Sequence, residues 1–237
     1  MRIGAPGTDL MTDIKLFYLE KGRGRPFILL HGNGANSDYF MGQIDAFAGQ
    51  FHVYAIDTRG HGRTPRGTMP FTIRQFAADL LGFMDEHQIE KAHLLGFSDG
   101  ANVAMVFAMQ HPERVDRLIL NGANLNASGV KRRVQIPIEI GYRIARCFSA
   151  KSESAGRNAE MLGLMVNEPD VSPAELAGIR AKTLVIAGTR DIIKEVHTRL
   201  IAEAIPDAKF VFVKGNHFIA NRNPRDFNRA VLDFLRS

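Results

Sequence analysis

The sequence lacks the features that mark secreted, membrane and metal-binding proteins. Its only cysteine is Cys147, so no disulfide can form within the chain. No run approaches the roughly 20 apolar residues that cross a bilayer, and residues 1–20 lack the apolar core of a signal peptide. Neither a metal-binding cluster nor a phosphate-cradling motif is present. We therefore expect a cytoplasmic protein with a flexible leader at residues 1–10, no membrane partner, no metal and no cofactor.

Positive charge is concentrated in one segment. The chain has 30 Lys and Arg residues against 25 Asp and Glu. Residues 124–157 contain seven of these cations and only two of the acids, which leaves 23 of each sign elsewhere. Nucleic acid could bind such a segment, but no aromatic platform or known motif accompanies it. We expect a solvated basic helix face and no nucleic-acid partner.

Apolar runs of strand length alternate with segments of helical period. Runs such as FILL, LVIA and FVFV are continuously apolar, as expected of strands that are covered on both faces of a parallel sheet. The predicted strands are residues 14–20, 27–31, 52–57, 92–96, 117–121, 183–187 and 210–213. This alternation predicts the α/β class, with a doubly wound, mostly parallel sheet.

Two helix starts can be predicted in detail. Thr72 and Gln75 form a capping-box pattern, and Phe71 and Phe76 are spaced as its hydrophobic staple. The dipeptide at residues 223–224, Asn-Pro, is typical of an N-cap followed by the first helical residue. Both patterns support helices between the predicted strands.

One region interrupts the alternation. Residues 124–178 show helical patterns without a convincing strand, so we expect a helical cap of two or three helices inserted between core segments 1–123 and 179–237. Two apolar stripes run along these helices. We expect substrate to contact residues of these stripes, namely Ile140, Ile144, Met161 and Met165.

The pattern G-x-S-x-G occurs at residues 96–100, as Gly-Phe-Ser-Asp-Gly. A strand is predicted before it and a helix after it, which is the context that a nucleophile elbow requires. A strand that turns directly into a helix forces the serine into a strained conformation and exposes its hydroxyl. Glycine at both flanks lets the backbones pass. Ser98 is therefore the candidate nucleophile.

A serine nucleophile needs a base, and the base needs an orienting acid. Downstream of Ser98, Asp191 follows one predicted strand and His217 follows the next. The carboxyl ends of parallel strands meet at one edge of the sheet, where open α/β sheets build their sites. The other downstream histidine, His197, falls within a helical pattern. We predict a Ser98–His217–Asp191 triad.

The oxyanion of an acyl transfer needs two N–H donors. One is expected from Asp99, directly after the nucleophile. The other is expected from the glycine-rich turn at residues 31–34, from Asn33 or, as the alternative, from Gly34.

These motifs resemble the α/β-hydrolase fold family of serine hydrolases, from about residue 14 to the end of the chain. The resemblance is carried by HGNG at residues 31–34, DTRGHGRT at 57–64, the elbow, GTRD at 188–191 and GNH at 215–217. LLGFSDG at 94–100, NGAN at 121–124 and IPDAKF at 205–210 look like the biphenyl-hydrolase-like (valacyclovir hydrolase) group. The family resemblance also implies a structural role for His61.

The side chain of Asp99 needs a separate explanation. A carboxylate about 6 Å from an oxyanion would cost roughly 3 kcal/mol at an effective dielectric near 20. Its charge could be offset by the N-terminus of the helix that it opens or by a cap arginine, Arg132 or Arg143. The third alternative is a cationic substrate group, because the resemblance implies that this acid holds the ammonium of an amino-acid ester.

The motifs predict a hydrolase of a small carboxylic ester, thioester or lactone that acts through an acyl-enzyme. Two alternatives stay open. The same three residues serve C–C bond hydrolases of this fold, and some proteins of the fold keep the triad while acting as ligand-sensing receptors.

Overall fold

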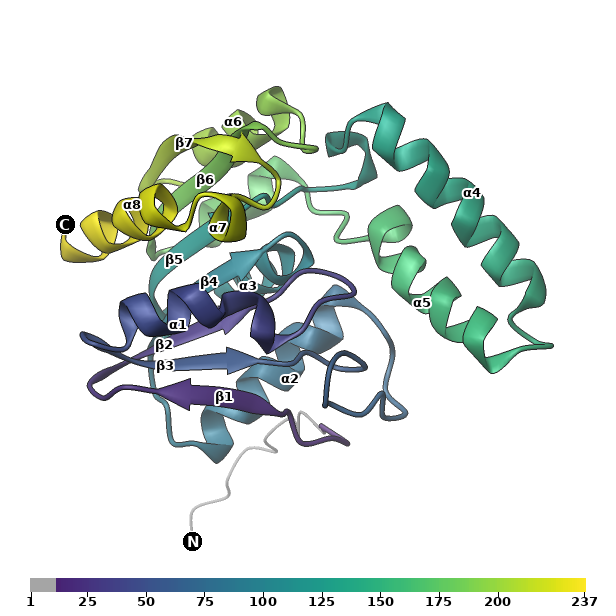
Figure 1. The fold of residues 1–237 in the computed structure, drawn as a ribbon, viewed down its shortest axis with the longest axis horizontal. Helices are drawn as coiled ribbons and strands as arrows, with labels where there is room; N and C mark the ends of the chain where they lie inside the picture. Colours follow the sequence, from purple (N-terminus) through teal and green to yellow (C-terminus); the bar gives the residue numbers. More distant parts are fainter. Residues whose placement is uncertain (1–11) are drawn as a thin grey trace, which may run out of the picture.

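The structure, a computed structural model, describes residues 12–237 and contains one seven-stranded sheet (Figure 1). The strand order is β1-β3-β2-β4-β5-β6-β7, and every neighbouring pair is parallel except β1 with β3. The strands are β1 (Tyr18–Lys21), β2 (Arg25–Leu30), β3 (Phe51–Ile56), β4 (Ala92–Phe97), β5 (Val115–Asn121), β6 (Lys182–Arg190) and β7 (Ala208–Asn216). The predicted α/β class with a doubly wound, mostly parallel sheet is confirmed. The expected leader lies outside the described residues.

All seven predicted strands are present, with differences at their ends. The first was predicted from residue 14, but β1 begins at Tyr18, which pairs with Ile56 at the end of β3. Before it, the Phe17 carbonyl accepts one more hydrogen bond from the Asp57 N–H, at 2.8 Å. β6 and β7 each run three residues beyond the predicted ends, to Arg190 and Asn216. The candidate acid and base therefore follow these strands directly.

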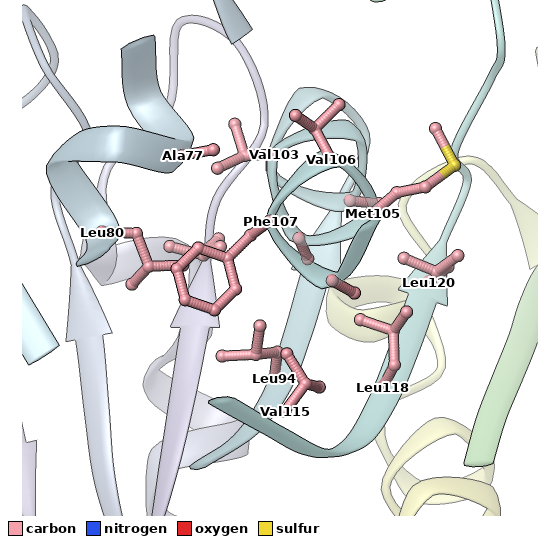
Figure 2. Packing of buried hydrophobic residues seen from close by; sticks show 14 of the residues in the cluster. Ala77, Leu80, Leu94, Val103, Met105, Val106, Phe107, Val115, Leu118 and Leu120 are labelled. Atoms are coloured by element: carbon pink, nitrogen blue, oxygen red, sulfur yellow. The ribbon is translucent and has the colours of Figure 1, made fainter. Parts of the chain in front are cut away.

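Helices cover both faces of the sheet. On one face pack α2 (Ile73–Glu86), α3 (Asp99–Gln110) and α6 (Glu195–Ala204). Figure 2 shows part of this core around α3, where Phe107 lies among Leu80, Leu94 and Val115. On the other face pack α1 (Met41–Phe47) and α8 (Pro224–Arg236), with the short α7 (Ile219–Arg222). The other elements of residues 12–237 are four 3₁₀ turns, η1 (Ser37–Phe40), η2 (Pro112–Arg114), η3 (Ala127–Gly129) and η4 (Pro173–Gly178).

The start of α2 confirms half of the predicted capping box. The Thr72 hydroxyl accepts from the Gln75 N–H at 3.1 Å, and the Phe71 and Phe76 rings contact edge to face with centroids 5.0 Å apart. The Gln75 side chain, however, donates to Asp79 and does not return to the Thr72 backbone. Asp79 is the better partner because it is a buried carboxylate that needs donors.

The prediction for α8 is likewise half right. Pro224 is the first helical residue, as predicted. Asn223 stands at the N-cap position but accepts no capping hydrogen bond. Its amide instead donates to the Lys214 carbonyl at 3.1 Å and to the Asp226 carboxylate at 3.0 Å.

Residues 124–178, all of them described, carry two long helices, α4 (Arg132–Phe148) and α5 (Glu153–Asn167). These helices form a pair that extends from the end of the sheet toward which the parallel strands point (Figure 1). The helices are in close contact at two glycines, since a Cβ at Gly141 would lie 3.4 Å from Leu162 and one at Gly163 would lie 3.4 Å from the Tyr142 ring. The role of this segment as a cap stays a prediction.

Two buried histidines should make the fold sensitive to mild acid. Burial lowers the pKa of His31 and of His93 from 6.5 to about 4. Between pH 6.5 and 4 the unfolded chain therefore binds more protons than the folded chain, so stability falls as pH falls through this window. At pH 4.5 each histidine should lower the free energy of unfolding by about 2 kcal/mol. Denaturant unfolding measured at several pH values will test this expectation.

The His93→Leu variant separates the contribution of one histidine. His93 lies between the Phe27 and Phe51 rings, so an apolar replacement suits the site. We expect its loss of stability toward pH 4.5 to shrink by about 2 kcal/mol. An unchanged slope in His93→Leu would contradict this assignment.

Candidate active site

The candidate site lies where the strand order reverses. β2 connects to β3 on one side, and the chain then crosses to β4 on the other side of β2. Ligands of open α/β sheets bind at this switch point, beyond the carboxyl ends of the strands. Asn33 follows β2 and Ser98 follows β4, so the two loops that carry the predicted nucleophile and oxyanion donors are neighbours.

The turn around Ser98 has the strain that the motif predicts. Ser98 adopts φ 54° and ψ −121°, a region that residues with a side chain rarely occupy. The flanking glycines permit close passage of the backbone. A Cβ at Gly96 would lie 2.2 Å from the Gly100 carbonyl oxygen, and one at Gly100 would lie 2.1 Å from the Leu30 carbonyl oxygen. Tight packing on both sides therefore holds the serine in this conformation.

The structure brings together the three side chains that the sequence predicts as a triad. Ser98 Oγ lies 3.0 Å from His217 Nε2, and His217 Nδ1 lies 2.6 Å from Asp191 Oδ1. Asp191 directly follows β6 and His217 directly follows β7. Both of these side chains are nearly fully buried. The arrangement has the connectivity of a nucleophile, a base and an orienting acid.

The environment of Asp191 keeps its carboxylate ionised. Burial opposes ionisation, but the hydrogen bond to His217 and the N–H groups of Ile193 and Gly188 outweigh it, so the pKa of Asp191 lies below its usual value. The two N–H donors lie 3.0 Å and 3.2 Å from the carboxylate oxygens. Lys131, which the sequence analysis did not single out, donates to the Asp191 carbonyl at 2.5 Å and fixes the same loop.

Aromatic rings surround the His217 imidazole. Phe97 and Phe218 have ring centroids 4.9 Å and 5.5 Å from it, and Tyr39 stacks on Phe97 at 4.5 Å. Sequence reasoning missed these residues, although Phe97 occupies the variable position of the elbow motif and Phe218 follows the histidine. Gly122, at φ 68°, leaves room for the imidazole, since a Cβ there would lie 2.7 Å from the ring.

The predicted oxyanion donors are available. Among residues 12–237, the backbone N–H groups of Asn33, Gly34 and Asp99 have no hydrogen-bond acceptor. Unused N–H groups beside a nucleophile are what an oxyanion hole requires. Gly34 stays an alternative to Asn33.

The Asp99 carboxylate is held by a contact that the sequence analysis did not anticipate. The Asn33 side-chain amide donates to it at 2.9 Å and donates its other hydrogen to the Met161 carbonyl of α5 at 2.8 Å. The Asn102 amide lies 3.4 Å away on the other side. Burial raises the pKa of Asp99, and these hydrogen bonds only partly oppose it. One asparagine thus links the first oxyanion loop, the elbow and α5.

One of the expected ways to offset the Asp99 charge, an ion pair with a cap arginine, receives no direct support. No ion pair joins Asp99 to Arg132 or to Arg143 in the part of the chain that the structure describes. Asp99 is the first residue of α3, so the N-terminus of that helix stays a way to offset its charge, although the carboxylate accepts no backbone N–H from the first turn there. Its hydrogen-bond donors within residues 12–237 are neutral amides.

The expected substrate contacts of the cap need correction at two positions. Ile140 and Ile144 are more than half exposed, so they do not line an enclosed pocket. The physical reason is that α5 packs against the opposite side of α4, near Gly141, and leaves this stripe to the solvent. Met161 and Met165 are half-buried, and the backbone of Met161 reaches Asn33.

The segment at residues 57–64 is a rigid turn. The Asp57 carboxylate accepts from the N–H groups of Ser37 at 2.6 Å and Arg63 at 2.8 Å. The buried Arg59 forms two hydrogen bonds to Asp79, at 2.6 Å and 2.7 Å. His61 is buried in this turn, with Nδ1 2.9 Å from the Arg59 carbonyl oxygen, and its structural role stays a prediction.

A groove of about 730 Å³ lies along the α4–α5 pair, and its lining includes neither Ser98 nor His217. It runs between the start of α2, at Phe71 and Thr72, and the α4–α5 pair. A narrow crevice that includes Asn33 and Asp99 shares Leu164 with this groove. Within residues 12–237 no set of three or more His, Cys, Asp or Glu side chains is arranged to bind a metal ion. No helix in that range has the length and apolar character needed to cross a bilayer.

Several known proteins with a similar sequence or fold are hydrolases by name. One relative is a protein of a Caulobacter species to which the name carbamate hydrolase RutD is given by inference. It is 30% identical over 88% of this chain and 89% of the relative. The 2-hydroxy-6-oxo-6-phenylhexa-2,4-dienoate hydrolase of Comamonas testosteroni is 29% identical over 95% of this chain and 93% of the relative. The enol-lactonase of Burkholderia xenovorans has a similar fold, with a TM-score of 0.80 at 23% identity, over 94% of this chain and 97% of its own.

The family model for the alpha/beta hydrolase fold matches residues 25–138. That segment runs from β2 through the elbow into α4. The similarity to the Caulobacter relative covers 88% of this chain and so includes the elbow and most of the other sequence motifs. The chain belongs to the α/β hydrolase fold family of hydrolases.

Proposed function

We propose that this protein is a serine hydrolase that cleaves a small carboxylic ester, thioester or lactone through an acyl-enzyme intermediate. The observation that carries the proposal is the continuous hydrogen-bonded chain from Ser98 Oγ to His217 at 3.0 Å and on to Asp191 at 2.6 Å. The strained backbone of Ser98 supports it further, because such strain is maintained at functional sites.

In the first half of the reaction, Ser98 Oγ attacks the substrate carbonyl carbon while His217 Nε2 takes the hydroxyl proton. Asp191 stabilises the imidazolium that forms, and it holds the proton of the ring on Nδ1. The N–H groups of Asn33 and Asp99 receive the oxyanion. When the tetrahedral intermediate collapses, His217 returns the proton to the leaving alcohol, and the acyl group stays on Ser98.

In the second half, water replaces the alcohol. His217 Nε2 takes a proton from this water as it attacks the acyl carbon, and a second oxyanion forms at the same N–H groups. Collapse releases the carboxylic acid and returns the proton to Ser98. The cycle needs no group beyond the side chains and backbone described.

A substrate screen tests this proposal. Purified protein should hydrolyse at least one class among short-acyl, aminoacyl, thioester and lactone substrates in repeated turnovers. A ligand-sensing receptor would give a single-turnover burst or very slow release with p-nitrophenyl esters. Absence of repeated turnover on all four classes would refute the ester-hydrolase proposal.

C–C bond hydrolysis is a second candidate. It is favoured by the 29% identity to the Comamonas testosteroni enzyme, whose named substrate is a 2-hydroxy-6-oxo-dienoate. The test is the absorbance of such a dienoate, which is lost when the C–C bond breaks. Turnover of the dienoate at a higher kcat/KM than any ester would make C–C cleavage the main activity.

The Asp99→Asn substitution tests the substrate class. Desolvation raises the pKa of the half-buried Asp99, whose hydrogen-bond donors within residues 12–237 are neutral, and a substrate ammonium would supply a cation. We expect the variant to lose about 1.5–3 kcal/mol in kcat/KM on aminoacyl esters, the worth of a charged hydrogen bond. Neutral esters should be unaffected or slightly faster, because a negative charge near the oxyanion has gone.

The matched substrates are the alanine and propionate esters of one alcohol, which differ only in the amino group. Both esters should be measured on both proteins. An equal response of the two esters would show that Asp99 supports the elbow and does not recognise a cation.

A further inference from the structure

The outward side of α4 carries an apolar stripe in contact with solvent. Ile136, Ile140, Ile144 and Phe148 are 41%, 53%, 56% and 54% exposed. They recur every four residues and so lie along one side of the helix. The opposite side of α4 is occupied by α5, which leaves this outer stripe without a partner within residues 12–237.

Cations accompany the outer stripe. Arg132, Arg133 and Arg143 each lie three or four residues from a stripe residue, so their side chains border it. All three are exposed, and none forms an ion pair within the described residues. The one acid on α4 is Glu139.

A complementary partner must be both apolar and anionic. A second copy of this chain fits poorly, because a two-fold dimer places a patch against itself and would bring these arginines close to one another. A solvated face explains the arginines but leaves four large apolar side chains in water. A bilayer with anionic lipids satisfies both, since acyl chains take up the stripe and headgroups pair with the guanidinium groups.

We propose that the outer face of α4, the stripe with Arg132, Arg133 and Arg143, docks the protein on an anionic membrane surface. The helix lies in the plane of the interface with its stripe among the upper acyl chains. Its 17 residues span about 25 Å at roughly 1.5 Å per residue. This docking is peripheral and departs from the expectation of no membrane partner. It does not depend on the proposed catalytic function.

Vesicle flotation of the full chain tests the proposal. Phosphatidylcholine vesicles with about one-third phosphatidylglycerol should carry the protein at low salt, and vesicles of phosphatidylcholine alone should carry much less. Binding should weaken as salt increases, because the electrostatic attraction is screened. No flotation with the anionic vesicles at low salt would overturn the proposal.

Three variants locate the surface. Combining Arg132→Gln, Arg133→Gln and Arg143→Gln should lower the partition coefficient about a hundredfold, at about fivefold per basic residue near an anionic surface. The pair Ile140→Gln and Ile144→Gln should lower it at least about tenfold. A control set removes the same charge elsewhere and should bind like wild type; it combines Lys214→Gln, Arg222→Gln and Arg225→Gln, all exposed.

The outcomes separate the possible partners. Thermal unfolding should show that each variant is folded. If only the arginine variant loses binding, the attraction is purely electrostatic and the acyl contact is refuted. Self-association that Ile140→Gln and Ile144→Gln abolish, without vesicle binding, would identify a second copy as the occupant. Equal losses in the control set would place the surface elsewhere.

Discussion

Replacing Ser98 with alanine is expected to reduce hydrolysis to near background, by a factor on the order of 10⁶ in kcat. The reason is that no other nucleophile lies within hydrogen-bonding distance of His217 Nε2 in the part of the chain that the structure describes. The hydroxyl contributes little to packing, so the variant should unfold at nearly the wild-type temperature. Labelling by a fluorophosphonate should disappear together with activity.

The matched control is Ser154→Ala, which removes an exposed hydroxyl from α5. It should keep both activity and labelling. Fluorophosphonate labelling that persists in Ser98→Ala would show that another residue is the nucleophile.

The Asp191→Asn substitution should lower kcat by about 10⁴-fold. The carboxylate accepts from His217 Nδ1 at 2.6 Å and so keeps Nε2 free to accept the Ser98 proton. An asparagine amide can donate to Nδ1 and favour the opposite tautomer, in which Nε2 already carries hydrogen. His217→Ala should be at least as damaging, since it removes the base itself. Steady-state kinetics on the best ester will measure both losses.

Glu195 is the control for the acid, because it lies close in sequence and is the first residue of α6. It pairs with Arg199 at 2.8 Å on the surface, so Glu195→Gln should change kcat by less than about twofold. A loss under about tenfold in Asp191→Asn would mean that another acid orients His217. A large loss in Glu195→Gln would identify that acid.

The positions of the triad could be predicted because they depend on backbone topology. Apolar runs mark strands, parallel strands end at one edge of the sheet, and the residues after β4, β6 and β7 must therefore meet there. The elbow could be predicted for a steric reason, since only glycine fits at Gly96 and Gly100. The order of serine, acid and histidine along the chain is what the resemblance to the α/β-hydrolase fold implies.

The contacts of Asp99 could not be predicted in the same way. Its hydrogen bond to Asn33 joins residues 66 positions apart, and the bond from Asn33 to Met161 joins residues 128 positions apart. Long-range side-chain contacts leave no periodic pattern in a sequence. The stacking of Tyr39 on Phe97 is also a contact between residues far apart in the sequence.

The orientation of α4 shows where periodicity alone is ambiguous. An apolar stripe predicts that one side of a helix is buried, but it does not say which partner covers that side. The sequence pattern favoured a stripe that faces substrate. In the structure the small residues of the other side, such as Gly141, take the contact with α5, and Ile140 and Ile144 lie outside.

The most direct test of the acyl-enzyme route is mass spectrometry of protein quenched in acid during turnover of a p-nitrophenyl ester. We expect the intact chain to gain the mass of one acyl group, and peptide mapping to place that group on Ser98. The adduct should be absent from Ser98→Ala and should accumulate if the second half of the reaction is slow. Steady turnover with an acyl group on another residue would contradict the account.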